Sequence, residues 1–324
     1  MTVPQVQLLA VDESSEGQRV DNYLMKVLKG VPKTHIYRLV RAGEVRVNKK
    51  RVQADTRLSL GDVVRIPPVR VSEPAPALDG ASAPPLEFPV LYEDDCFLAV
   101  NKPAGVAVHG GSGVSFGIIE QLRSARPEAK MLELVHRLDR ETSGVLLIAK
   151  KRSALKHLQD QFRNRTIDKR YLALVQGVWP ERQKVVDLEL LKYHLQNGER
   201  RVKVVPKGTE GAQRSVSLVQ VLAQGLAPST ADAVSLLEVK IKTGRTHQIR
   251  VHLSHYSAPI AGDDKYGDFQ WNKSLQRAGL KRMYLHAFFV NLQHPVTLAP
   301  IQIKADIPHE LVDWSLNWNV KDDQ

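Results

Sequence analysis

Residues 136–144 read HRLDRETSG and run into an apolar segment, GVLLIAK, which predicts a buried strand over residues 144–150. The carboxylate of Asp139 stands between Arg137 and Arg140, where a strand is expected to give way to a turn. Neighbouring positive charge favours the ionised carboxylate, which is then available as a nucleophile or a base. A structural ion pair explains the same residues equally well.

A second dense segment, TGRTHQIRVH at residues 243–252, follows the predicted strand SLLEVKI. Arg245 and Arg250 offer planar donors suited to a carboxylate or a phosphate, with His247 and Gln248 between them. A helix over residues 248–254 would not require His247 and Arg250 to face the same way.

A third candidate is Tyr171, in the sequence KRYLALV at residues 169–175. An aromatic ring beside basic residues can stack on a nucleobase, although a tyrosine in a strand more often fills a sheet or a core.

Strands outnumber helices over residues 88–312. Further strand-like runs occur at residues 233–241, 283–292 and 301–305, and a helix is predicted from about residue 153 to residue 164. This balance predicts an α+β catalytic domain over residues 88–312, built on a large mixed or antiparallel sheet. Residues 313–324 are expected to form a C-terminal tail.

A small basic domain is predicted over residues 1–71. Residues 16–71 carry thirteen Lys and Arg against five Asp and Glu, a net of +8, which is most of the formal charge of +11. Apolar residues at helical spacing predict two short helices, the second running from Pro32 to Gly43, and GEVRVNKKR and DVVRIPP predict strands. The residues expected to contact nucleic acid are Lys33, Arg38, Arg41, Arg46, Lys49, Lys50 and Arg51. A solvated charged surface is the alternative.

Residues 72–87 separate the two domains. They contain four prolines, four alanines and no Lys or Arg. Proline stiffens the chain toward an extended form, so this stretch is predicted to be a linker.

Several protein classes are disfavoured. One cysteine, Cys96, forbids a disulfide framework, and no apolar run approaches the ~18 residues of a membrane span, so a cytoplasmic protein without membrane contact is expected. HRLD lacks the pattern of a kinase catalytic loop, and the glycines of HGGSG lack the Lys-Ser/Thr of a phosphate-binding loop. No partner carboxylate marks a glycosidase, and no zinc signature accompanies the histidines, so no metal site is expected.

In their order along the chain, NKPAGVAVHGG, HRLDRETSG, KRYLALV, TGRTHQIRVH and YLHA resemble the motifs of the RluA family of pseudouridine synthases. The N-terminal sequences GQRVDNYL, GEVRVNKK and GDVVRIPP resemble the small α/β RNA-binding domain named after ribosomal small-subunit protein S-four. The resemblance covers essentially the whole chain.

The resemblance implies roles for five residues. Asp139 corresponds to the catalytic aspartate, Tyr171 to the tyrosine that stacks on the target base, and Arg250 to the ion-pair partner of Asp139. Arg137 corresponds to the arginine that helps to hold the nucleotide out of the RNA stack, and Leu285 is expected to line the pocket wall. The isomerisation imports no atom and changes no oxidation state, so no cofactor is required. Whether the aspartate attacks the sugar or removes a ribose proton is left open.

The resemblance also implies a substrate: several uridines of 23S ribosomal RNA near the peptidyl-transferase region. Naked RNA and a ribosome assembly intermediate both remain open as the substrate form, and a monomer is expected. The alternative is a non-catalytic RNA-binding or ribosome-assembly protein that uses the same basic surfaces.

Overall fold

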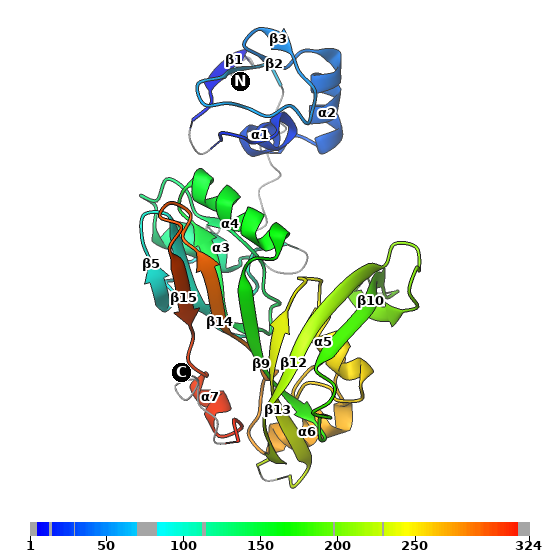
Figure 1. Ribbon diagram of the computed structural model, residues 1–324. Coiled ribbons are helices and arrows are strands. Elements are labelled where there is room, and N and C mark those ends of the chain that lie inside the picture. Colours follow the sequence, from blue (N-terminus) through cyan, green and yellow to red (C-terminus); the bar gives the residue numbers. More distant parts are fainter. Residues whose placement is uncertain are drawn as a thin grey trace. The chain divides into compact units, whose positions relative to one another are not determined.

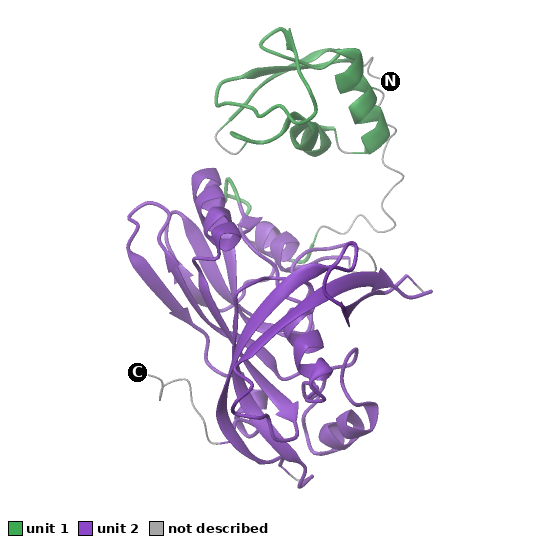
Figure 2. Ribbon diagram, turned by 45° about the vertical axis from the view of Figure 1, so that its right-hand side comes forward, with its two compact units in different colours: residues 1–84, 127–131 green, residues 85–126, 132–324 purple. Residues whose placement is uncertain are grey.

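The computed structural model describes residues 5–12, 15–28, 30–69, 83–111, 115–196, 198–228 and 230–316. The chain forms two compact units, the first from residues 1–84 and 127–131 and the second from residues 85–126 and 132–324 (Figure 2). Most of the expected linker, residues 72–82, lies outside the described residues.

The N-terminal unit is a small α/β domain. Its helices are α1 (Val20–Val27) and α2 (Lys33–Ala42), and its strands are β1 (Gln7–Ala10), β2 (Arg46–Val47), β3 (Lys50–Arg51) and β4 (Val63–Ile66). The strands form a sheet in the order β1-β4-β2-β3. The apolar stripes of both helices meet this sheet in one core that includes Leu24, Ile36 and Val64.

Local sequence accounts for the shape of this unit. Pro32 is the residue before α2, one position earlier than the first helical position expected for it. Gly43 ends α2 in the left-handed conformation, at φ 73°, as glycine does at many helix ends. Asn48 and Lys49 both have positive φ and join β2 to β3 through a two-residue hairpin loop.

The second unit is built on an 11-stranded sheet with the order β11-β10-β12-β13-β9-β14-β8-β6-β5, to which β15 and β7 add at β14 and β8. The strands are β5 (Val90–Glu93), β6 (Phe97–Lys102), β7 (Glu133–Leu134), β8 (Ser143–Ala149), β9 (Asp168–Gln176), β10 (Val185–His194), β11 (Arg200–Val205), β12 (Gln213–Leu226), β13 (Ala233–Ile241), β14 (Leu285–Gln293) and β15 (Pro300–Lys304). The pairing of β14 with β8 is parallel and the other pairings are antiparallel. The predicted α+β fold on a mixed sheet is confirmed.

Five helices accompany this sheet in the described residues: α3 (Ile118–Ala125), α4 (Arg152–Asn164), α5 (Gln248–His255), α6 (Phe269–Arg277) and α7 (His309–Val312). Helix α4 contacts β8, and α5 contacts both strands of the β10–β11 hairpin; Figure 1 shows α5 beside β10. Trp314 is 4% exposed and packs in one core with Leu311 and Trp271. The folded unit therefore continues past residue 312, the last residue of the predicted catalytic domain, into the predicted tail over residues 313–324.

A buried lysine joins the end of β6 to the loop that precedes β8. Lys102, the last residue of β6, is 0% exposed. Its Nζ donates to the carbonyl oxygens of Pro103 at 2.7 Å and Arg140 at 2.9 Å. Burial lowers the pKa of Lys102 from 10.5 to about 7.

This burial predicts a pH-dependent stability. Between pH 7 and 10.5 the unfolded chain holds a proton on Lys102 that the folded chain gives up, so the folded state gains stability as the pH rises. We expect the free energy of unfolding of wild type, relative to Lys102→Met, to rise by about 2 kcal/mol from pH 7 to pH 9. Urea unfolding of both proteins at the two pH values measures this, and parallel pH dependences would contradict it.

Candidate active site

Asp139, Tyr171, Arg250, Arg137 and Leu285 line one pocket of about 90 Å³. The pocket adjoins a wider cleft of about 890 Å³, with Arg137, Asp139 and Arg250 in the walls of both. The structure thus brings together all five residues that the resemblance selects within the catalytic domain.

The loop that carries Asp139 lies between β7 and β8 and is fixed by main-chain contacts. The amide of Thr142 donates to the carbonyl of Asp139 at 3.1 Å, and the amide of Gly105 donates to that of Arg140 at 2.9 Å. Gly144 follows with φ +109°, and a Cβ there would lie 2.2 Å from the carbonyl oxygen of Ala287 on the parallel neighbour β14. Only glycine lets β8 enter the sheet this close to the loop.

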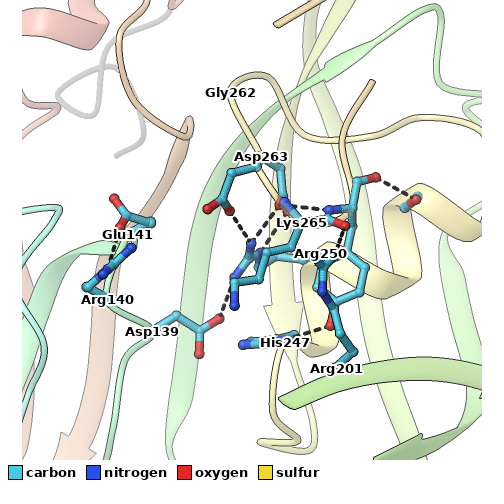
Figure 3. A network of polar contacts seen from close by, with 12 residues as sticks. Asp139, Arg140, Glu141, Arg201, His247, Arg250, Gly262, Asp263 and Lys265 are labelled. Carbon is cyan, nitrogen blue, oxygen red and sulfur yellow. Dashed lines mark hydrogen bonds and ion pairs between the residues drawn. The ribbon is translucent and has the colours of Figure 1, made fainter. Parts of the chain in front are cut away.

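The main partner of Arg250 is Asp263. Arg250, from α5, donates through Nε at 2.7 Å and Nη2 at 2.6 Å to the two carboxylate oxygens of Asp263, and its Nη2 reaches Asp264 at 3.2 Å. Its Nη1 lies 3.6 Å from Oδ2 of Asp139, beyond hydrogen-bonding distance (Figure 3). From the sequence, Arg250 is expected to pair with Asp139, and Asp263 is not a predicted partner.

Both members of the Arg250–Asp263 pair are buried, with side chains 3% and 1% exposed. Burial alone raises the pKa of Asp263, but the hydrogen bonds and charge of Arg250 lower it overall. Burial lowers the pKa of Arg250, and Asp263 and Asp139 more than reverse the shift. The two groups hold each other ionised, and Nη1 remains directed toward Asp139.

Tyr171 and Leu285 form the sheet wall of the pocket. Tyr171 lies in β9 opposite Val239 of β13, and Leu285 begins β14 opposite Ala173 of β9. Tyr171 is 8% exposed, and burial, with the negative charge of Asp139, raises the pKa of its hydroxyl. The hydroxyl therefore stays protonated at neutral pH, and the ring is a fixed apolar surface beside Asp139.

The other residues of the 136–144 motif have separate tasks. Arg137 is exposed and lines the cleft, whereas Arg140 forms an ion pair with Glu141 at 2.7 Å. Nε2 of His136 accepts a hydrogen bond from the amide of Leu147 at 3.1 Å, and burial lowers the pKa of His136 to about 3. His136 is a neutral structural residue.

The residues of the 243–252 motif likewise divide into structural residues and residues that line the pocket. Gln248 is 3% exposed and bonds the hydroxyls of Thr243 and Ser217. His252 is 0% exposed and lies between the hydroxyls of Ser215 and Ser217. These two residues fasten the motif to β12, the strand that carries both serines.

His247 differs from its neighbours in the motif. It precedes α5 in the left-handed conformation, at φ 52°, and lines both the pocket and the cleft together with Arg250. Residues 247 and 250 therefore do face the same space.

A cluster of Asp94, Cys96 and His294 has the composition of a metal site, with potential ligand atoms within 4.8 Å of one another. Nδ1 of His294 accepts hydrogen bonds from the amides of Val296 and Thr297, and Nε2 lies 2.7 Å from Asp94. A neutral imidazole whose Nδ1 accepts carries its proton on Nε2. The histidine nitrogen that faces the cluster is therefore a donor to Asp94, and the cluster fits a structural hydrogen-bond network better than a metal site.

The basic side chains of the N-terminal unit lie at its surface. All seven residues expected to contact nucleic acid are exposed: Lys33, Arg38, Arg41, Arg46, Lys49, Lys50 and Arg51. Arg46 and Arg51 donate to the carbonyls of Gly43 and Ala42. Among the described residues, none of the seven forms an ion pair with a carboxylate, so their charges are available to an outside anion.

The pocket residues Asp139, Tyr171 and Arg250 and the N-terminal unit lie in segments that match two known sequence families. Residues 96–255 match the profile of RNA pseudouridylate synthase, and residues 18–64 match that of the S4 domain. Together with the full-length similarity described next, these matches show that the chain belongs to the pseudouridine synthase family.

Curated relatives match along nearly the whole chain. Ribosomal large subunit pseudouridine synthase C of Haemophilus influenzae is 49% identical over 312 residues, covering 94% of this chain and 93% of that protein. The protein of the same name from Escherichia coli is 49% identical over 315 residues, 95% of each chain. The solved structure of human RNA pseudouridylate synthase domain containing 1 is 27% identical, has a TM-score of 0.56 and covers 71% of this chain and 86% of that one.

No helix in the described residues combines the length and apolar character of a membrane span.

The Arg250–Asp263 pair predicts an asymmetry between two adjacent aspartates. Asp263→Asn leaves the buried guanidinium without its main counter-charge and is expected to lower the free energy of unfolding by about 3 to 5 kcal/mol. Asp264→Asn removes an acid whose side chain is 56% exposed and is expected to cost about 1 kcal/mol or less. Denaturant unfolding of both variants measures the difference, and equal costs would show that the pair does not organise this region.

Proposed function

We propose that this protein converts uridine to pseudouridine in large-subunit ribosomal RNA, with Asp139 as the catalytic carboxylate. The observation that carries the proposal is the pocket in which Asp139, Tyr171 and Arg250 meet. The names of the relatives supply the substrate class, and the exposed basic face of the N-terminal unit fits an RNA partner.

The pocket suits a reaction that breaks the bond between uracil and ribose and rejoins the ring through carbon five. Asp139 is 29% exposed and can meet a ribose, and Arg250 lies behind it at 3.6 Å. Either attack on the sugar or removal of a ribose proton needs an oriented, ionised carboxylate. The guanidinium places a positive charge on one side of Asp139, 3.6 Å from its Oδ2.

In this proposal, the target base and its place in the RNA stack are contacted by Tyr171, Leu285 and Arg137. Moving a base out of its stack costs a free energy of a few kcal/mol, and stacking on an aromatic ring offsets about 1 to 3 kcal/mol of it. Tyr171 provides the ring and Leu285 the apolar wall, while exposed Arg137 stands at the mouth, where it can occupy the space that the base vacates.

Replacing Asp139 by Asn tests the proposal. Ribosomal RNA transcribed with uridine tritiated at carbon five releases tritium when the new bond to carbon five forms. We expect wild type to release tritium and Asp139→Asn to release none above background, while both proteins are folded by circular dichroism and bind the RNA equally. Equal release by the two proteins would rule out Asp139 as the catalytic carboxylate.

The N-terminal unit is proposed to bind RNA phosphates through the seven exposed basic residues. It supplies affinity without base recognition, because lysine and arginine that contact phosphates carry no sequence information. Binding releases counterions, so the contribution is measured by its salt dependence.

Removing three of these charges should flatten the salt dependence of RNA binding. For the triple variant Lys33→Ala, Arg38→Ala and Arg41→Ala, the slope of log K against log salt concentration is expected to fall in magnitude by about 2, at roughly 0.7 to 0.9 per lost phosphate contact. The control removes three exposed charges at the other unit, Lys273, Arg277 and Lys281. Equal flattening in both triple variants would mean that net charge, and not this face, binds the RNA.

Finer features of the activity are also proposed. We infer that the targets are several uridines of 23S RNA near the peptidyl-transferase region, modified in the cytoplasm. We also infer that the protein acts as a monomer.

A further inference from the structure

His247 reaches the pocket of Asp139 with one ring nitrogen already committed. Its Nδ1 lies 2.8 Å from the hydroxyl of Tyr266. Its other nitrogen, Nε2, makes no hydrogen bond to the described residues, and the ring lines the walls of both the pocket and the cleft. Figure 3 shows the free end of the His247 ring directed toward Asp139.

The surroundings of Tyr266 decide which nitrogen of His247 carries the proton. The hydroxyl oxygen of Tyr266 accepts a hydrogen bond from the amide of Val202, in β11, at 2.9 Å. The one hydroxyl proton of Tyr266 is then donated to Nδ1 of His247, the other group within hydrogen-bonding distance among the described residues. A neutral His247 with an accepting Nδ1 carries its proton on Nε2.

His247 is neutral at physiological pH. Burial lowers its pKa, and the positive charge of Arg250 acts in the same direction, while the negative charge of Asp139 opposes them without reversing the shift. The pocket therefore contains an uncharged N–H donor close to Asp139, held in one tautomer by a chain of hydrogen bonds that begins in β11.

We propose that Nε2–H of His247 donates a hydrogen bond to a carbonyl oxygen of the target uracil and stabilises the base while it is detached from the ribose. This inference rests on the proposed function and adds a residue to it.

The chemistry of the reaction calls for such a donor. When the bond from nitrogen one to the ribose breaks, its electron pair stays with the uracil, and the negative charge spreads to the carbonyl oxygens. The base then forms the bond from carbon five to the ribose, loses the proton of carbon five to solvent and regains a proton on nitrogen one. An oriented donor at a carbonyl oxygen stabilises the charge at the stage when it is largest.

A neutral donor suits this pocket better than a second cation. A further positive charge beside Asp139 would add to that of Arg250 and hold the carboxylate more tightly, which would lower its reactivity. An N–H dipole stabilises the negative charge on the base. It adds no further cation to the interaction between Asp139 and Arg250.

A matched pair of variants tests the role of Nε2–H. Glutamine can place an amide N–H near the position of Nε2, whereas leucine has a similar size and no donor, and both must adopt the same left-handed backbone at residue 247. Steady-state tritium release from carbon-five-labelled ribosomal RNA gives kcat and KM for each variant. His255→Leu is the control, because His255 is exposed on the same helix and lies outside the pocket.

We expect His247→Leu to lower kcat about 10- to 100-fold with KM changed by less than about 3-fold, as for loss of a donor to a charge that develops during reaction. His247→Gln should recover a large part of this loss, and His255→Leu should match wild type. Tyr266→Phe frees His247 to change tautomer and should lower kcat by less than His247→Leu does.

Three results would overturn the inference. They are an unchanged kcat in His247→Leu, an increase in KM alone, or equal losses of kcat in His247→Leu and His247→Gln. Wild type and Asp139→Asn run beside these variants. Absence of release by wild type, or full release by Asp139→Asn, would count against the proposed function, whereas normal release by His247→Leu beside an active wild type and an inactive Asp139→Asn would count against His247 alone.

Discussion

The buried ion pair between Arg250 and Asp263 is the interaction on which the site depends. A guanidinium that is 3% exposed needs a counter-charge at hydrogen-bonding distance, and Asp263 supplies it with both carboxylate oxygens. Asp263 in turn accepts from the amides of Lys265 and Tyr266, so the pair also shapes the turn over residues 263–266. If Asp139 were the sole partner of Arg250, the carboxylate proposed to react would also be the one that neutralises a buried cation. The structure separates these two tasks.

The same turn connects the pair to the rest of the cleft. Tyr266 lies under the guanidinium of Arg250, with the ring centre 5.2 Å away, and its hydroxyl joins β11 to His247. Lys265, next to it, forms an ion pair with Glu199, which immediately precedes β11. The hairpin, the turn and α5 are thus held by one polar network around the arginine (Figure 3). Two members of this network lie beside Asp139: Arg250, whose Nη1 is 3.6 Å from its Oδ2, and His247, which lines the same pocket.

Much of this arrangement could be predicted from sequence, for physical reasons that can be named. The strand at residues 144–149 is apolar at nearly every position because both faces are buried, and Gly43 marks a helix end because its left-handed conformation disfavours a Cβ. Asp139 and Arg250 lie in motifs that are richer in polar residues than a surface strand or helix requires for contact with water. Asp263 could not be found in this way. It lies in GDDKYGD, where three acids and no periodicity give no reason to select one, and only the fold brings it beneath Arg250.

The polar residues within one motif also could not be sorted before the fold was known. Gln248 and His252 look as reactive as His247 in sequence, yet their polar atoms are taken up by serine and threonine hydroxyls of neighbouring elements. A buried polar group must find a partner, so most polar residues in a dense motif will be structural. Those left for chemistry are the ones whose atoms face a cavity without a protein partner. In the segment from residue 243 to residue 252, this criterion separates His247 from Gln248 and His252, and it depends on tertiary contacts that no local pattern encodes.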